Sequence, residues 1–260
     1  MPASFPATPL FHYSSLADLT ALLDTQSLTL TPLDQPDELN AVLSFIQNVI
    51  VTAYPALNAN LFNIAPYPVF SFSLTAQVDS ANLWQNFYPA GGFAISIDPT
   101  QLSTVMDADQ LELKQCLYDD TEKTNFIIST IVDCSRDIPD SDNAMFAKRI
   151  REINRGILNY AGILKDASRS GEQEWRIIAR YNWTNILMGP TDPPDALPLP
   201  IVNNSVAAPL ISPPYTNVNV QQIVIGPHAD MAQAKADCDQ LVSTYGLTSA
   251  VITESAVPYQ

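Results

Sequence analysis

Two glutamates one residue apart, within SGEQEWRIIARY at residues 170–181, are the side chains of this sequence best suited to do chemistry. A strand over residues 173–181 would place charged side chains on one face and mainly apolar ones on the other. The charged face would consist of Glu172, Glu174, Arg176 and Arg180. One such carboxylate can stabilise a developing positive charge and the other can orient or deprotonate an acceptor. The same pattern fits the solvent-facing side of an edge strand, and both interpretations stay open.

The two carboxylates would also affect each other and their neighbour. Like charges this close raise the pKa of one carboxyl, which favours a role as a base. Arg176, on the same face, could offset the repulsion or meet a pyrophosphate oxygen of a ligand.

Two further segments carry polar side chains on predicted strands. In PLFHYSS, at residues 9–15, His12 lies on the face opposite to Phe11 and Tyr13. A lone histidine there is either functional or hydrogen-bonded to backbone near a strand end. In YPVFSFSLTA, at residues 67–76, the alternation gives a serine-bearing face with Ser71 and an aromatic face.

The remaining pattern places these strands in an α+β domain. Apolar residues at helical spacing predict helices within residues 14–28 and over 37–54, 80–88, 121–134, 141–165 and 231–245. Short strands are expected at 27–32, 91–98, 219–227 and 247–255. Because strands and helices follow in unequal runs, the order favours α+β over a doubly wound parallel sheet. Eight prolines between 189 and 214 predict an extended, partly rigid connection.

Composition indicates one soluble domain. With 260 residues and 47% hydrophobic residues the chain can bury a full core, and no compositional break divides it, so we expect a single domain over 1–260. No stretch reads as a signal peptide or a membrane span. The three cysteines are far apart and fit buried free thiols in the cytoplasm.

Charge restricts the partners. The net charge of −15 argues against nucleic acid, whose phosphates must be neutralised by Lys and Arg. Eleven of the twelve Lys and Arg residues lie between Lys114 and Arg180. An anionic ligand would therefore be met by this middle segment or by backbone amides.

Several site types are absent from the sequence. It has no phosphate-binding glycine loop, no H-E-x-x-H and no G-x-S-x-G, and its eight glycines leave little material for phosphate loops. With two histidines, His12 and His228, a multi-histidine metal site is excluded. No metal is expected, and any general base is expected to be a carboxylate.

Taken together, FHYSS, VFSFSLT, LWQNFYPAGGFAISID, GEQEWRI and IVIGP resemble an uncharacterised bacterial domain family of unknown function. Its members open with H-Y-[TS]-[ST], continue with a phenylalanine-serine strand and a tryptophan helix, and carry a glutamate-[WY]-R strand. That family is in turn similar to the ADP-ribosyltransferase fold. The resemblance implies a split, mostly antiparallel sheet flanked by helices, with NAD as substrate.

The resemblance also implies roles for individual residues. His12 would hold the NAD ribose, Ser71 or Ser73 would take the middle-strand role, and Glu174 would be catalytic with Glu172 as its companion. Nicotinamide and adenine rings stack on aromatic faces, and the candidates for this are Tyr13, Trp84, Tyr88 and Trp175. In arginine-directed transferases an E-x-E pair usually accompanies a first-strand arginine, so a histidine at position 12 leaves the acceptor open.

We therefore expect an intracellular NAD-dependent ADP-ribosyltransferase or NAD glycohydrolase acting on an unknown acceptor. The first alternative is a non-catalytic interaction or immunity-type module that keeps the fold and binds a basic protein, as its acidity suggests. The second is a glycoside- or ester-type hydrolase that uses the carboxylate pair.

Overall fold

The computed structural model describes residues 6, 8–25, 27–32, 36–54, 70–98, 111–135, 157, 160–179, 201–202, 205–209, 220–228 and 230–259. Its strands are β1 (Leu10–Ser14), β2 (Ser27–Pro32), β3 (Phe70–Thr75), β4 (Phe93–Ile97), β5 (Leu111–Gln115), β6 (Glu174–Ala179), β7 (Ile201–Val202), β8 (Ser205–Pro209), β9 (Gln222–Ile225) and β10 (Val251–Glu254). Its helices are α1 (Leu16–Thr25), α2 (Pro36–Ala53), α3 (Ala81–Phe87), α5 (Asp120–Ser135), the 3-10 helix η2 (Ala167–Glu172) and α7 (Met231–Tyr245).

These strands form one mixed and mostly antiparallel sheet. Its order is β10-β9-β4-β1-β3-β2-β8-β7, and β6 joins β3 to β5 off this path. Among the described strands only β10 and β9 pair in parallel. The expected α+β class and the mostly antiparallel sheet flanked by helices are confirmed.

The sheet divides at β3. One edge of β3 pairs with β6 from Ser71 to Thr75. The other edge is shared, because β1 pairs with it only at Phe11↔Thr75 and β2 only at Thr31↔Ser71 and Pro32↔Phe70. The strands β1 and β2 therefore diverge from each other along the middle of β3.

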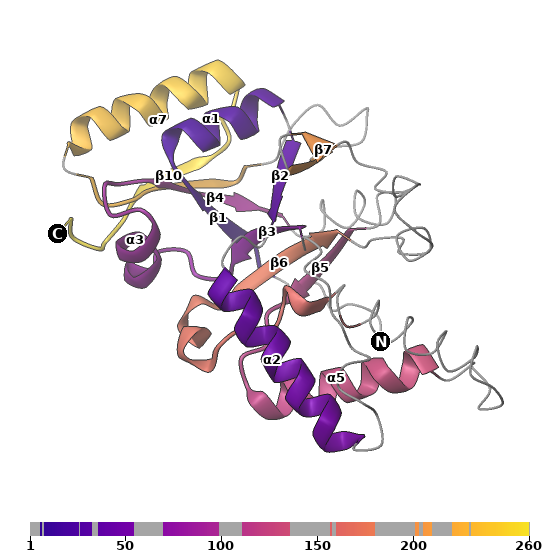
Figure 1. Ribbon diagram of the computed structural model, residues 1–260. Helices are drawn as coiled ribbons and strands as arrows, with labels where there is room; N and C mark the ends of the chain where they lie inside the picture. The colour runs from indigo at the N-terminus through magenta and orange to yellow at the C-terminus, as the bar shows by residue number, and fades with distance from the viewer. Residues whose placement is uncertain are drawn as a thin grey trace.

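Helices cover both sides of the sheet. Figure 1 shows α1 and α7 side by side over the part formed by β1, β4 and β9, where they pack against each other and against β1 and β9. The helices α2 and α5 pack together at the other end of the molecule, below β5 and β6 in the same view. The short α3 lies apart from α1 and α7, on the side of the sheet toward which Phe11 and Tyr13 point.

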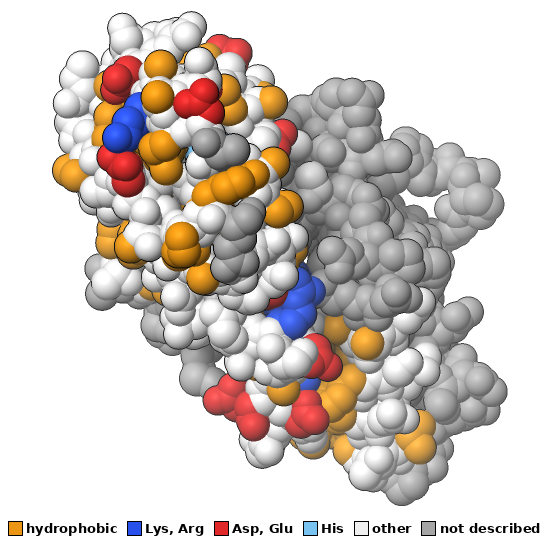
Figure 2. Space-filling model, turned by 90° about the vertical axis from the view of Figure 1, so that its left-hand side faces the viewer, with side chains coloured by type: hydrophobic (Ala, Val, Ile, Leu, Met, Phe, Trp, Pro, Cys, Tyr) orange, Lys and Arg blue, Asp and Glu red, His pale blue; other side chains and the backbone are white. Residues whose placement is uncertain are grey.

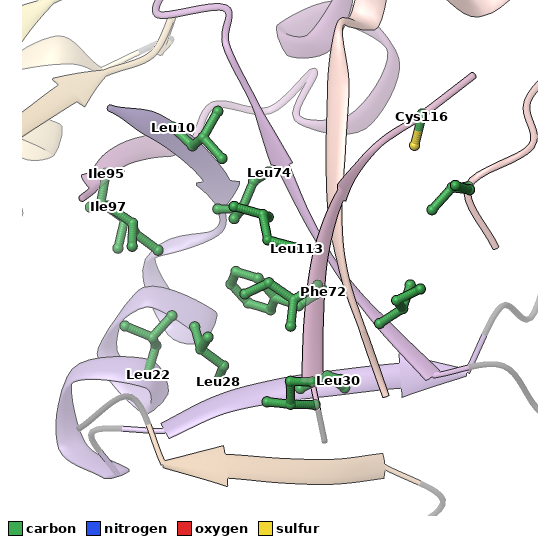
Figure 3. Close-up of a cluster of buried hydrophobic side chains, with 14 of the residues drawn as sticks. Leu10, Leu22, Leu28, Leu30, Phe72, Leu74, Ile95, Ile97, Leu113 and Cys116 are labelled. Carbon is green, nitrogen blue, oxygen red and sulfur yellow. The ribbon is translucent and has the colours of Figure 1, made fainter. Parts of the chain in front are cut away.

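Apolar side chains from most of these elements converge on one core. Leu22 of α1, Leu28 of β2, Phe72 of β3 and Ile95 of β4 lie in it and are at most 7% exposed. Figure 3 shows these side chains pointing toward one another between the strands. Alternation along β3 explains the arrangement, because Phe72 and Leu74 face this core while the hydroxyl residues that alternate with them face away.

Other expectations are met only in part by the described residues. Within the proline-rich connection, β7 and β8 form a hairpin that extends the sheet beyond β2, and the rest of residues 189–214 lies outside the described residues. Most of the helix expected over 141–165 also lies outside them, and the chain has left the helix by residue 162. Cys116 and Cys238 are buried free thiols, as expected. No described helix is both long and apolar enough to cross a membrane.

Candidate functional site

A cavity of about 420 Å³ lies where the sheet divides. Pockets that bind small molecules typically measure roughly 300–1,000 Å³. The described residues that line it are Phe11, His12, Tyr13, Thr31, Ser71, Ser73, Leu74, Thr75, Leu83, Phe87, Tyr88, Lys165, Arg169, Glu172, Glu174 and Arg176. Of the candidate residues from the sequence, Trp84 and Trp175 are not among them, and Arg180 lies outside the described residues.

His12 lies at the divergence of β1 from β3. Its Nδ1 is 3.0 Å from the backbone carbonyl oxygen of Ser73, and its ring stacks on Phe72 with centroids 4.2 Å apart. Burial lowers the pKa of His12, although the Ser73 carbonyl and Asp18 act in the opposite direction. The imidazole is therefore neutral at pH 7. Because a carbonyl only accepts hydrogen bonds, the proton is on Nδ1, and Nε2 is the nitrogen that can accept a hydrogen bond.

The hydroxyl residues of β3 share the face of β6 that carries the charged side chains. Ser73 is directly opposite Arg176, and Thr75 is opposite Glu174. Ser73 is exposed in the cavity, whereas Ser71 and Thr75 are buried. Thr75 donates through Oγ1 to the Glu172 backbone oxygen at 2.7 Å, which ties β3 to the segment before β6.

The two glutamates are buried and bound to three cations. Glu174 accepts from Arg176 Nε at 2.7 Å and from Lys165 Nζ. Glu172 accepts from Arg169 Nε at 2.8 Å and from the same Lys165 Nζ. Exposed fractions of 5% for Glu172 and 7% for Glu174, together with the interior position of β6, rule out the solvent-facing edge strand.

The closely spaced pair predicted a raised pKa for one of the two carboxyls, and that carboxyl is not Glu174. Burial would raise its pKa, but the charges and hydrogen bonds of Arg176 and Lys165 outweigh that effect and lower the pKa to about 2. Glu174 is thus ionised at every pH near neutrality. It can stabilise positive charge, but it is too weakly basic to take up a proton efficiently.

The alternation pattern predicted that Glu172 lies on the charged face of the strand, and this prediction is wrong. Glu172 ends η2, and Gln173 follows in the left-handed conformation with φ 45°. β6 begins only at Glu174. The left-handed Gln173 lies between the two glutamates, and both carboxylates still contact Lys165 Nζ.

Lys165 and Arg169 were missed by the sequence reasoning. Lys165 is held by its backbone, since its N–H donates to the Leu117 oxygen at 2.9 Å and its carbonyl accepts from Lys123 Nζ at 3.0 Å. Asp166 then caps η2 by accepting from the Ser168 N–H at 2.8 Å. The available signal was local, because Arg169 precedes Glu172 by three residues and Lys165 precedes Glu174 by nine.

Aromatic residues form a second part of the cavity lining, the aromatic end. Tyr13 donates through its hydroxyl to the Gln77 oxygen at 3.1 Å and accepts from the Ser80 N–H at 2.9 Å. Tyr88 donates to the Tyr13 backbone oxygen at 2.7 Å. Burial is the main cause that raises the pKa of each of these hydroxyls to about 12. Both tyrosine rings are thus held in fixed positions, and their hydroxyl groups are uncharged at neutral pH.

Trp84 packs behind the ring of Tyr13 and does not line the cavity. It is 1% exposed, its Nε1 donates to Asp79 Oδ1 at 2.7 Å, and its ring centroid is 4.3 Å from that of Tyr13. Gly226 leaves room for the indole, since a Cβ at that position would lie 2.7 Å from Trp84 Cζ3. Trp84 therefore supports the ring of Tyr13. Trp175, the other tryptophan considered, packs against the main core.

Metal binding has no visible support in the described part of the chain. No three His, Cys, Asp or Glu side chains there are grouped so that they could hold a metal ion.

Comparison with known proteins finds one matching domain model and no activity. A domain of unknown function, DUF2971, is found at residues 83–177. The matched span runs from α3 into β6, so it includes Lys165, Arg169, Glu172, Glu174 and Arg176 and leaves out the residues of β1 and β3. No curated protein and no solved structure matches the chain.

Proposed function

We propose that the cavity binds NAD and cleaves its nicotinamide-ribose bond, as an NAD glycohydrolase or an ADP-ribosyltransferase. The observation that supports this most is the meeting of His12, Ser73 and Glu174, from three separate strands, in one cavity at the division of the sheet. Each has a property that the reaction uses. Glu174 is ionised, His12 is neutral with an acceptor nitrogen, and Ser73 is exposed to a ligand.

In the proposed reaction the bond between ribose C1′ and the nicotinamide ring nitrogen breaks. The bonding electron pair moves to the ring nitrogen, so neutral nicotinamide leaves and positive charge develops on the ribose. The Glu174 carboxylate stabilises that charge electrostatically. Water then attacks C1′ and releases one proton to solvent, giving ADP-ribose. In a transfer reaction the nucleophile of an acceptor, whose identity is open, takes the place of water.

Glu172 has a positioning role in this scheme. Its carboxylate is bound by Lys165 and Arg169, so it orients the two cations next to Glu174 and does not act as a base.

The test is nicotinamide release from NAD by the purified protein, followed by chromatography. We expect Glu174→Gln to lower kcat roughly 10²- to 10³-fold, because the charge that faces the transition state is removed. Glu254→Gln, on the exposed strand β10, makes the same chemical change remote from the cavity and should leave the rate unchanged. Ser73→Ala leaves the buried ion pairs intact, and we expect it to lower kcat/KM roughly tenfold.

Two results would contradict the proposal. One is a native protein that releases no nicotinamide and whose melting temperature is unchanged by millimolar NAD. The other is full activity in Glu174→Gln.

A second candidate is a non-catalytic interaction or immunity-type module. The observation in its favour is that both glutamates are already bound by Lys165, Arg169 and Arg176, which is how a purely structural ion cluster would look. A net charge of −15 suits a basic protein as partner. This candidate predicts no effect of NAD on thermal stability, and a complex with a basic protein that salt dissociates.

A further inference from the structure

The charged end of the cavity contains more positive than negative charge. Its described ionic lining residues are the cations Lys165, Arg169 and Arg176 and the carboxylates Glu172 and Glu174. The neighbouring His12 adds no charge at pH 7, because burial lowers its pKa. The described lining at this end therefore has a local excess of one positive charge.

We propose that this end is an anion subsite that binds the phosphate or diphosphate group of the ligand through Arg169, supported by Lys165. The inference deepens the proposed function, since NAD contains a diphosphate, and it rests on that function for the identity of the ligand. Neither Lys165 nor Arg169 has a part in the bond cleavage described above. They are assigned to binding, next to the carboxylate that faces the ribose.

Arg169 is placed to meet a ligand. It is the most accessible of the three cations, with a side chain 28% exposed against 1% for Lys165 and 6% for Arg176. Its Nε donates to Glu172 at 2.8 Å, which fixes the plane of the guanidinium at the cavity wall. A guanidinium whose orientation is fixed in advance loses little freedom on binding and matches the geometry of phosphate oxygens.

Lys165 strengthens the subsite from behind. Its Nζ bridges the two carboxylates, so neither carboxylate presents a full uncompensated charge to an approaching anion. Without this lysine the same lining would carry equal numbers of cations and carboxylates.

The acidity of the whole chain opposes anion binding only weakly. Figure 2 shows acidic side chains spread over one face of the molecule and few basic ones. At physiological ionic strength such exposed charges are screened beyond about 8 Å. The cations of the cavity are partly desolvated, and they act at contact distance on a bound anion. For a bound anion, the local excess of positive charge in the cavity therefore outweighs the repulsion from the negative net charge of the chain.

The shape of the cavity restricts the ligand class further. The short helices α3 and η2 lie against each other, and they bring the aromatic end and the charged end to one site. On α3, Phe87 is 45% exposed and lines the cavity. A ligand that uses both ends has a planar ring and an anionic group, which is the chemistry of a nucleotide.

The test is calorimetric titration of ADP-ribose, inorganic diphosphate and nicotinamide into the native protein and single variants. We expect diphosphate to compete with ADP-ribose, and Arg169→Gln to weaken both roughly 10- to 100-fold, as expected for loss of a charge-assisted contact. The affinities of Arg169→Lys for both ligands should lie between those of the native protein and those of Arg169→Gln. Glu172→Gln raises the local positive charge and should tighten diphosphate binding, which a merely structural role for Arg169 would not produce.

Lys235→Gln is the matched control, because it removes one positive charge from the exposed surface pair with Glu254. It should leave binding of ADP-ribose and diphosphate unchanged. Nicotinamide, which has no phosphate, should bind equally to native protein and Arg169→Gln.

The outcomes separate this inference from the proposed function. Diphosphate that does not compete with ADP-ribose, or native-like binding of both by Arg169→Gln, overturns the anion subsite even if NAD is cleaved. If both anions bind in a way that depends on Arg169 but NAD releases no nicotinamide, the anion subsite is supported and the cleavage proposal is wrong.

Discussion

The two ends of the cavity are stabilised by different forces. The charged end is built mainly from one short stretch, residues 165–176, in which buried cations and carboxylates neutralise each other. The aromatic end is assembled from β1, the loop before α3, and α3, and neutral hydrogen bonds hold it. Loss of one partner of a buried neutral hydrogen bond costs about 1–3 kcal/mol, whereas breaking a buried ion pair costs about 3–5 kcal/mol. We therefore expect mutation and pH to affect the two ends unequally.

The largest effect is expected from Lys165→Met. The substitution leaves two buried carboxylates without their shared cation, so the free energy of unfolding should fall by about 3–5 kcal/mol. Urea denaturation measures it. Lys235→Met, at a lysine side chain 49% exposed, should change stability by less than about 0.5 kcal/mol. A loss below about 1 kcal/mol in Lys165→Met would show that the cluster contributes little to stability.

The second-largest difference in stability between the two ends is expected in an acid titration. The pKa of Glu174 falls from 4.5 to about 2 on folding, so its contribution is complete above about pH 5 and is lost as the pH falls toward 2. The expected loss is roughly 3 kcal/mol. Tyr13 and Tyr88, with pKa values raised to about 12, lose their contribution only as the pH rises from 10 toward 12.

Urea midpoints between pH 6 and pH 2.5 test this prediction. Glu174→Gln should flatten the acid slope, and Tyr88→Phe should leave that slope unchanged. An equally steep acid slope in Glu174→Gln would assign the titration to other carboxyls.

The smallest of the three effects is expected at the aromatic end. Tyr13→Phe removes the hydroxyl that joins the Gln77 carbonyl and the Ser80 N–H, which should lower the free energy of unfolding by about 1–3 kcal/mol. Tyr245→Phe, which removes a hydroxyl bond to Asp24 at the surface, is the control and should cost less. If both substitutions have the same effect, the hydroxyl of Tyr13 is not a structural link.

Much of the site could be predicted because strand alternation is local. The pattern FSFSLT separated the hydroxyl face of β3 from its core face, and the structure agrees at Ser73 and Phe72. The same rule was wrong at Glu172, because alternation holds only while the backbone stays extended. Gln173 leaves that conformation, and a glutamine gives no warning of a positive φ. Trp84 could not be distinguished from a ligand-stacking ring, since its burial depends on Gly226 and Asp79.

The sequence alone determined the mixture of strands and helices, the hydroxyl face of β3, and the closely spaced carboxylates, because hydrophobic periodicity reports on the nearest neighbours along the chain. Only the tertiary structure decided that β1 and β2 separate along β3, that His12 and Glu174 line the same cavity, and that Lys165 bridges both glutamates. Strand pairing across 60 to 100 residues and the burial of charged groups are set by packing of the whole chain, which no local pattern encodes.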